Sequence, residues 1–229
     1  AGQVVGNAST ASGIPQAGVV WQGGGIQMIG TLGGTSSYAG AINQAGQVTG
    51  AASPPGDTGE QAYRWTNGVM TPIPSLGGRA SAGYAINDLG QVAGQSKPTG
   101  SLLGRAFFWD GTTTRDLGTL GGSSSAAFGI NNEGVVVGYA LDSNDRQKAF
   151  VWNGTTLIDL HSLLVNPGEW EALYIAYDIN NAGQIVGVGT RTGHVELTGF
   201  VLTPVPEPGT LNLIAAFFAI CAASCARGR

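Results

Sequence analysis

Short apolar runs, separated by turn-forming residues, fill most of the chain. In residues 79–122 the strand-like runs are SAGYAI, QVAGQ, RAFFW and TTTRDLGTL. Asn87 to Gly90 make a four-residue turn after the first run, and Asp110-Gly111 is a strong hairpin signal between the third and fourth. A longer loop, SKPTGSLLG, joins the second run to the third. This pattern predicts four antiparallel strands.

The same pattern recurs every 44 residues. Leucines of the GTLGG and PSLGG motifs keep this spacing at Leu32, Leu76 and Leu120. The IN..G motif keeps it too, with a five-residue insertion before its last copy, and begins at Ile42, Ile86, Ile130 and Ile179. Tryptophans follow at Trp21, Trp65 and Trp109, and Trp152 is one residue short. Three landmarks in one register identify a structural repeat.

Four strands in about 44 residues is the size of one β-propeller blade. A β-helix would have shorter rungs, and a sandwich would not require similar copies. We therefore predict an all-β fold of four-stranded antiparallel blades, propeller-like and open or incomplete because the first and last copies are partial. A C-terminal hydrophobic helix is expected in addition. The expected units of the repeat domain, residues 1–203, are 1–34, 35–78, 79–122, 123–170 and 171–203.

Two further features of the unit suit a blade. The first strand is rich in alanine and glycine (YAGAI, AGYAI, AAFGI), as a strand near the axis must be slim. The third strand repeats a small residue, an aromatic residue and tryptophan, which would fill the space between blades. We expect these aromatic residues to be core, including Trp21, Trp65, Trp109 and Trp152.

The C-terminal segment, residues 204–229, has a different pattern. Pro206, Glu207 and Pro208 precede an apolar run from Leu211 to Ala226, and Arg227 and Arg229 close the chain. A helix of 16 to 18 residues covers about 24 to 27 Å, at the short end of what spans a bilayer. Basic residues after the run favour a cytoplasmic C-terminus, so the repeat body would lie outside the cytoplasm. The alternative is a buried helix of a globular domain.

In motif, order and spacing this tail resembles the PEP-CTERM sorting signals of Gram-negative bacteria. The resemblance implies recognition by a membrane protease, exosortase, through Pro206, Glu207, Pro208, Arg227 and Arg229. It also implies a precursor anchored in the inner membrane by residues 211–226, then a cell-surface or extracellular product. The chain starts at Ala1 without a charged segment followed by an apolar stretch, so we expect the signal peptide to lie outside this sequence.

Over nearly all of residues 1–203 the units resemble the HAF repeats of bacterial extracellular proteins. The motifs are RAFFW and KAFVW, then DLGTLGG and IN..G.VVG. This chain departs from the family where Arg105 and Lys148 replace the name-giving histidine, and where Leu202 replaces tryptophan in the last copy. The family implies location and architecture but no defined activity.

Composition narrows the function further. The net charge of −4 with no basic block argues against nucleic-acid binding. Both cysteines, Cys221 and Cys225, lie in the tail, so the body would have no disulfide. The two histidines, His161 and His194, lie in different copies without metal-ligand spacing, and the serines lack a nucleophile elbow. We expect no metal, cofactor or catalytic residue.

The loop between the second and third strands varies most between copies, and such loops on a uniform scaffold often bind ligands. The candidate ligand residues in these loops are Asp57, Glu60, Lys97, Arg105, Asp142, Asn144, Asp145 and Arg146. Oxygens in the DSND segment suit calcium, although an EF-type glycine and glutamate are absent. We predict a non-catalytic surface or biofilm-matrix protein that makes weak contacts with polysaccharide or surface proteins.

The alternative is a carbohydrate-active propeller enzyme, a glycosidase or lyase. Its acid and base would come from Asp57, Glu60, Asp142 and Asp145. Other carboxylates, such as Asp88, Asp110 and Glu133, lie in repeated turns and are expected to be structural.

Overall fold

The computed structural model describes residues 2–9, 17–205 and 219–223. Within these residues the chain forms twenty β-strands, arranged in five sheets of three, four, four, four and five strands. The helical structure found in this part of the chain is one 3-10 helix, η1 (Leu160–Leu163). The prediction of an all-β fold is confirmed.

The sheets follow one another along the chain. The first contains β1 (Val4–Ala8), β2 (Ala17–Gln22) and β3 (Gly25–Met28). The second contains β4 (Ser37–Ile42), β5 (Val48–Ala52), β6 (Gln61–Thr66) and β7 (Val69–Pro72). The third contains β8 (Gly77–Ile86), β9 (Val92–Pro98), β10 (Arg105–Trp109) and β11 (Thr114–Gly118). The fourth contains β12 (Gly121–Ile130), β13 (Val136–Asp142), β14 (Gln147–Trp152) and β15 (Leu157–Asp159). The fifth contains β16 (Leu164–Asn166), β17 (Trp170–Ile179), β18 (Ile185–Arg191), β19 (Thr198–Val205) and β20 (Ala219–Ala223).

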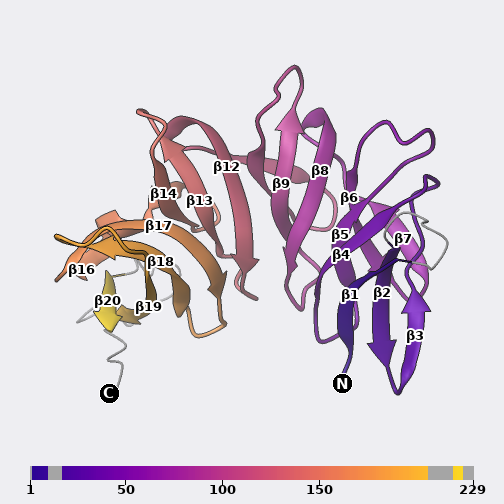
Figure 1. Ribbon diagram of the computed structural model, residues 1–229, viewed down its shortest axis with the longest axis horizontal. Helices are drawn as coiled ribbons and strands as arrows, with labels where there is room; N and C mark the ends of the chain where they lie inside the picture. Colours follow the sequence, from indigo (N-terminus) through magenta and orange to yellow (C-terminus); the bar gives the residue numbers. More distant parts are fainter. Residues whose placement is uncertain (1, 10–16, 206–218, 224–229) are drawn as a thin grey trace.

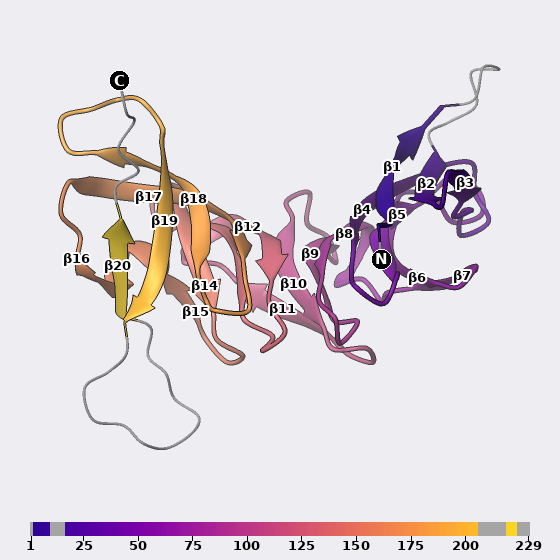
Figure 2. The same cartoon turned by 90° about the horizontal axis from the view of Figure 1, so that it is seen from below.

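Each of the middle three sheets is an antiparallel meander in which strands pair in chain order. Figure 1 shows the five sheets succeeding one another around an arc whose two ends do not meet. Seen from below, the first and fifth sheets lie at opposite ends of the molecule (Figure 2). The predicted blades in an open, propeller-like arrangement are therefore confirmed.

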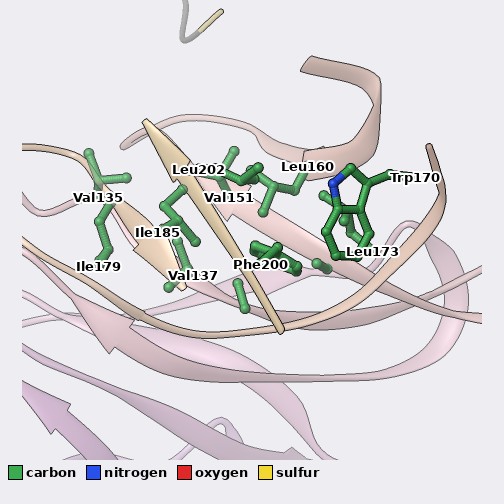
Figure 3. Packing of buried hydrophobic residues seen from close by; sticks show 12 residues of the cluster. Val135, Val137, Val151, Leu160, Trp170, Leu173, Ile179, Ile185, Phe200 and Leu202 are labelled. Atoms are coloured by element: carbon green, nitrogen blue, oxygen red, sulfur yellow. The ribbon is translucent and has the colours of Figure 1, made fainter. Parts of the chain in front are cut away.

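Hydrophobic cores lie between adjacent sheets. Trp65, Trp109 and Trp152 are buried, and each packs against residues of the preceding sheet. In the last sheet the equivalent Leu202 is also buried. Figure 3 shows this last core, in which valines of the fourth sheet face residues of the fifth, among them Ile185, Phe200 and Leu202. Packing of each blade on its predecessor thus explains the repeated aromatic pattern.

Trp21 does not follow this rule. The prediction that it is buried is wrong, because its side chain is 41% exposed. The first sheet packs against the second, and in the described structure no sheet lies on its other side. The surface that covers Trp65, Trp109 and Trp152 is therefore missing at Trp21.

Asparagines of the IN..G motif connect the sheets. The Asn43 Nδ2 group donates to the Asn87 carbonyl at 2.8 Å, and Asn87 Nδ2 donates to the Asn131 carbonyl at 2.9 Å. Each asparagine also closes its own turn, as when Asn87 Oδ1 accepts the Gln91 N–H at 3.0 Å. A buried amide that satisfies backbone groups in two sheets explains why the repeat keeps asparagine here.

The predicted C-terminal helix from Leu211 to Ala226 is wrong over Ala219–Ala223. These residues form β20, which pairs antiparallel with β19 and parallel with β16. Without β20, one edge of β19 would present unpaired N–H and C=O groups, and an extended apolar segment satisfies them. The sorting-signal residues Pro206, Glu207, Pro208, Arg227 and Arg229 lie outside the described residues, as does the rest of the apolar run.

In the described ranges no helix is long and apolar enough to cross a bilayer.

Candidate functional site

The variable loops place Asp57 and Asp145 at equivalent points of the second and fourth sheets. Asp57 accepts the Thr35 N–H and hydroxyl, both at 3.0 Å, and Asp145 Oδ1 accepts the Ser123 N–H at 2.9 Å. Both aspartates have positive φ, 47° and 54°. Asp57 therefore holds its loop against the segment just before β4, and Asp145 holds its loop against the N-terminal part of β12. The third sheet separates the two residues, so they do not form one site.

Asp142 has a structural role as well. Its Oδ1 accepts the Asn144 N–H at 2.8 Å and the Arg146 N–H at 3.0 Å, which closes the turn between β13 and β14. These backbone hydrogen bonds are the main cause that lowers the pKa of Asp142. Three predicted ligand residues are thus brought together, but two of them contribute their backbone N–H groups to this turn.

Replacing Asp57 by asparagine should make stability less dependent on acid pH. Hydrogen bonds from Thr35 lower the pKa of Asp57 below its usual 3.8. A carboxylate with a lowered folded-state pKa stabilises the fold above its unfolded pKa, and this stabilisation is lost as pH falls through the folded-state value. Urea midpoints at pH 6 and pH 3 should therefore differ less in Asp57→Asn than in the wild type. Leu102→Ala, in another loop, serves as the control, and an equal pH dependence in both variants would contradict this role.

The remaining loop candidates are dispersed. Arg105 forms an ion pair with Asp116 at 3.7 Å, with both side chains about one-third exposed, and such pairs contribute little to stability. Lys97 is half-buried in β9, and Asn144 and Arg146 have exposed side chains. Glu60 is exposed in the loop before β6. In the described part of the chain, no three His, Cys, Asp or Glu side chains are grouped closely enough to hold a metal ion.

A row of aromatic side chains crosses three successive sheets, mostly on β8, β12 and β17, the strands that end at the IN..G turns. Phe128 of β12 lies 5.7 Å from Tyr84 of β8 and 6.2 Å from Tyr177 of β17, measured between ring centroids. Tyr139 of β13 joins the row at 5.9 Å from Phe128. We call Tyr84, Phe128, Tyr139 and Tyr177 the aromatic row. It connects the third, fourth and fifth sheets.

A repeated irregularity in the strands produces this row. The pairing register of β8, β12 and β17 shifts between the residues on either side of Tyr84, Phe128 and Tyr177. A β-bulge leaves its extra residue unpaired and changes the direction of its side chain. The second sheet has the same shift around Gly40, which has no side chain. Tyr84, Phe128 and Tyr177 therefore each occupy a position of their strand that the ladder leaves unpaired.

The aromatic row is partly accessible. Tyr177 is 49% exposed, while Tyr84, Phe128 and Tyr139 are half-buried. Burial is the main cause that raises the pKa of Tyr84, and nearby Tyr139, Glu60 and Tyr38 add to it. Asp178, next to Tyr177, is exposed.

Sequence reasoning missed the aromatic row. It treated the first strands as slim segments of alanine and glycine, although aromatic residues recur in register at Tyr84, Phe128 and Tyr177. This recurrence of aromatic residues at one position of the repeat was the signal from which the row could have been predicted. The spacing of small residues is also needed, because a Cβ on Gly129 would lie 2.8 Å from the Asp178 Cα. Strands β12 and β17 therefore lie close together at the point where Phe128 and Tyr177 are partly exposed.

No protein-family model matches the chain, and a search of curated proteins found no match. Among solved structures, the chain is similar to the β-propeller domain of the Trilobed protease from Pyrococcus furiosus, which has an open velcro topology. The TM-score is 0.50 with 17% sequence identity, and the similarity covers 69% of this chain and 49% of that one. The chain thus spans about half the length of that structure. At this identity the similarity concerns the fold, and it agrees with an open β-propeller.

Proposed function

We propose that the chain is the body of an exported, non-catalytic surface or extracellular-matrix protein. It would make weak contacts with polysaccharide or other surface proteins. The non-catalytic part of the proposal rests on Asp57, Asp142 and Asp145, because each carboxylate accepts a backbone N–H group of its own sheet. Export and sorting rest on the resemblance of the repeats to HAF repeats and of the tail to exosortase signals.

The chemistry of these carboxylates supports this role over a glycosidase. The general acid of a glycosidase must hold a proton near neutral pH, which requires a raised pKa. The hydrogen bonds at Asp57 and Asp142 lower the pKa of both groups. Neither side chain is suited to donate a proton to a leaving group.

Export and processing can be tested in the native host. Mass spectrometry of the surface form should find the mature C-terminus near Pro206 to Pro208. Glu207→Gln should accumulate unprocessed protein in the inner-membrane fraction, and Glu196→Gln, an exposed residue of the body, should be processed normally. A surface form that still ended at Arg229 would overturn the sorting proposal.

The non-catalytic role has its own test. The purified protein should release no reducing ends from a panel of neutral and acidic polysaccharides. Turnover that disappeared in Asp142→Asn, with the urea midpoint unchanged, would instead support an enzyme.

A further inference from the structure

The aromatic row has the features of a surface that binds extended sugars. Aromatic side chains of the cores, such as Phe107 and Phe150, are at most 1% exposed, whereas Tyr177 in the row is 49% exposed. The row therefore does not simply fill space between sheets. A pyranose ring offers a face of C–H groups that packs on an aromatic face, and tyrosine adds a hydroxyl for hydrogen bonding.

The tyrosine hydroxyls of the protein differ in whether they already form a hydrogen bond within the described residues. The hydroxyls of Tyr63 and Tyr174 bond to the Tyr38 carbonyl and to the Thr190 hydroxyl. In the part of the chain that the structure describes, the hydroxyls of Tyr84, Tyr139 and Tyr177 have no such partner. These three hydroxyls are available to a ligand.

We propose that the aromatic row binds a neutral polysaccharide, with sugar rings stacked on Tyr84, Phe128 and Tyr177. The inference rests on the proposed binding role and names its ligand class. Asp178 follows Tyr177 and is exposed, and the segments SAGYAI, SAAFGI and YIAYDI contain no lysine or arginine, the nearest in β8 being Arg79, five residues before Tyr84. Carboxylates accept hydrogen bonds from sugar hydroxyls but repel uronic acids, so the charge favours a neutral chain over an acidic one.

Repetition favours a polymer over a single sugar. One stacking contact between partly exposed groups gives weak binding. Equivalent aromatic residues in three successive sheets can hold neighbouring units of one chain, and each further contact is then intramolecular. Affinity should therefore rise with the length of the sugar chain.

Native affinity electrophoresis of the full chain tests the proposal. The gels contain hydroxyethyl cellulose, laminarin or galactomannan as neutral probes, and alginate as the acidic probe. At least one neutral probe should retard the protein, and alginate should not. Phe128→Ala and Tyr177→Ala should each weaken that retardation about tenfold, the change expected for loss of one stacking contact.

Two controls separate loss of binding from loss of folding. Leu102→Ala changes a side chain that is 87% exposed and lies outside the row, and it should bind like the wild type. Phe128→Tyr keeps the stacking face and should retain binding. Urea midpoints verify that every variant is folded.

The proposal is overturned if no neutral probe retards the protein, if only alginate does, or if Phe128→Ala and Tyr177→Ala bind as strongly as Leu102→Ala. Those results would leave processing of the tail and contacts with surface proteins unaffected. Failure here is therefore distinguishable from failure of the proposed function.

Discussion

Trp109→Ala should lower the free energy of unfolding by about 3 to 5 kcal/mol, as large-to-small changes of buried aromatic residues do. The side chain is 3% exposed and packs with Ala62 of the preceding sheet and with Ile73, which directly follows that sheet. The Arg64 guanidinium lies 4.8 Å from the centre of its ring, so the variant also loses a cation–π contact. Chemical denaturation followed by circular dichroism measures the change.

Trp109→Phe is the matched comparison. The Trp109 indole N–H is buried without a hydrogen-bond partner, and phenylalanine removes that unsatisfied donor while it keeps most of the apolar volume. Its cost should be clearly smaller than that of alanine. Equal losses for the two variants would show that volume at this position does not hold the sheets together.

Gly138→Ala should be at least as damaging, although it adds a single methyl group. A Cβ at Gly138 would overlap the carbonyl oxygen of Ala126 in β12. Backbone atoms cannot move away as a side-chain end can, so we expect a loss of about 3 kcal/mol or more, similar to severe overpacking. The measurement is again the urea midpoint of unfolding.

Gly199→Ala provides the control. Gly199 lies in β19, its φ is not positive, and a Cβ there would meet only the Gly187 carbonyl oxygen at 3.9 Å. Such a substitution should be neutral or stabilise by about 0.4 to 1 kcal/mol through the unfolded state. A tolerated Gly138→Ala variant would mean that the approach of β12 to β13 is looser than described.

The equivalent glycines show why the motif is repeated. At Gly50, Gly94 and Gly187 a Cβ would likewise overlap a carbonyl oxygen of the neighbouring first strand. Each of these glycines pairs with a residue beside the β-bulge. The last glycine of the longer IN..G.VVG motif is thus a consequence of the bulge that exposes the aromatic residues.

The sequence by itself determined the repeat, the strand order within each unit and most of the core. Trp65, Trp109 and Trp152 keep one register because each fills the same space against the preceding sheet. Such regularity can be recognised in the sequence, because every blade needs apolar, small and turn-forming residues at the same positions.

Only the tertiary structure decided which of the candidate side chains remain available to a ligand. Asp57 and Asp145 look like ligand residues in the sequence, but each accepts a backbone N–H about 22 residues away, a pairing that local pattern does not reveal. The segment Ala219–Ala223 is apolar enough for a helix, yet β19 offers an edge with which it pairs. The aromatic row depends on β-bulges and on contacts between strands 44 to 49 residues apart, so it exists only when the sheets are assembled. Local sequence pattern specifies the strands and turns of each blade, whereas long-range hydrogen bonding and packing decide which side chains form the proposed binding surface.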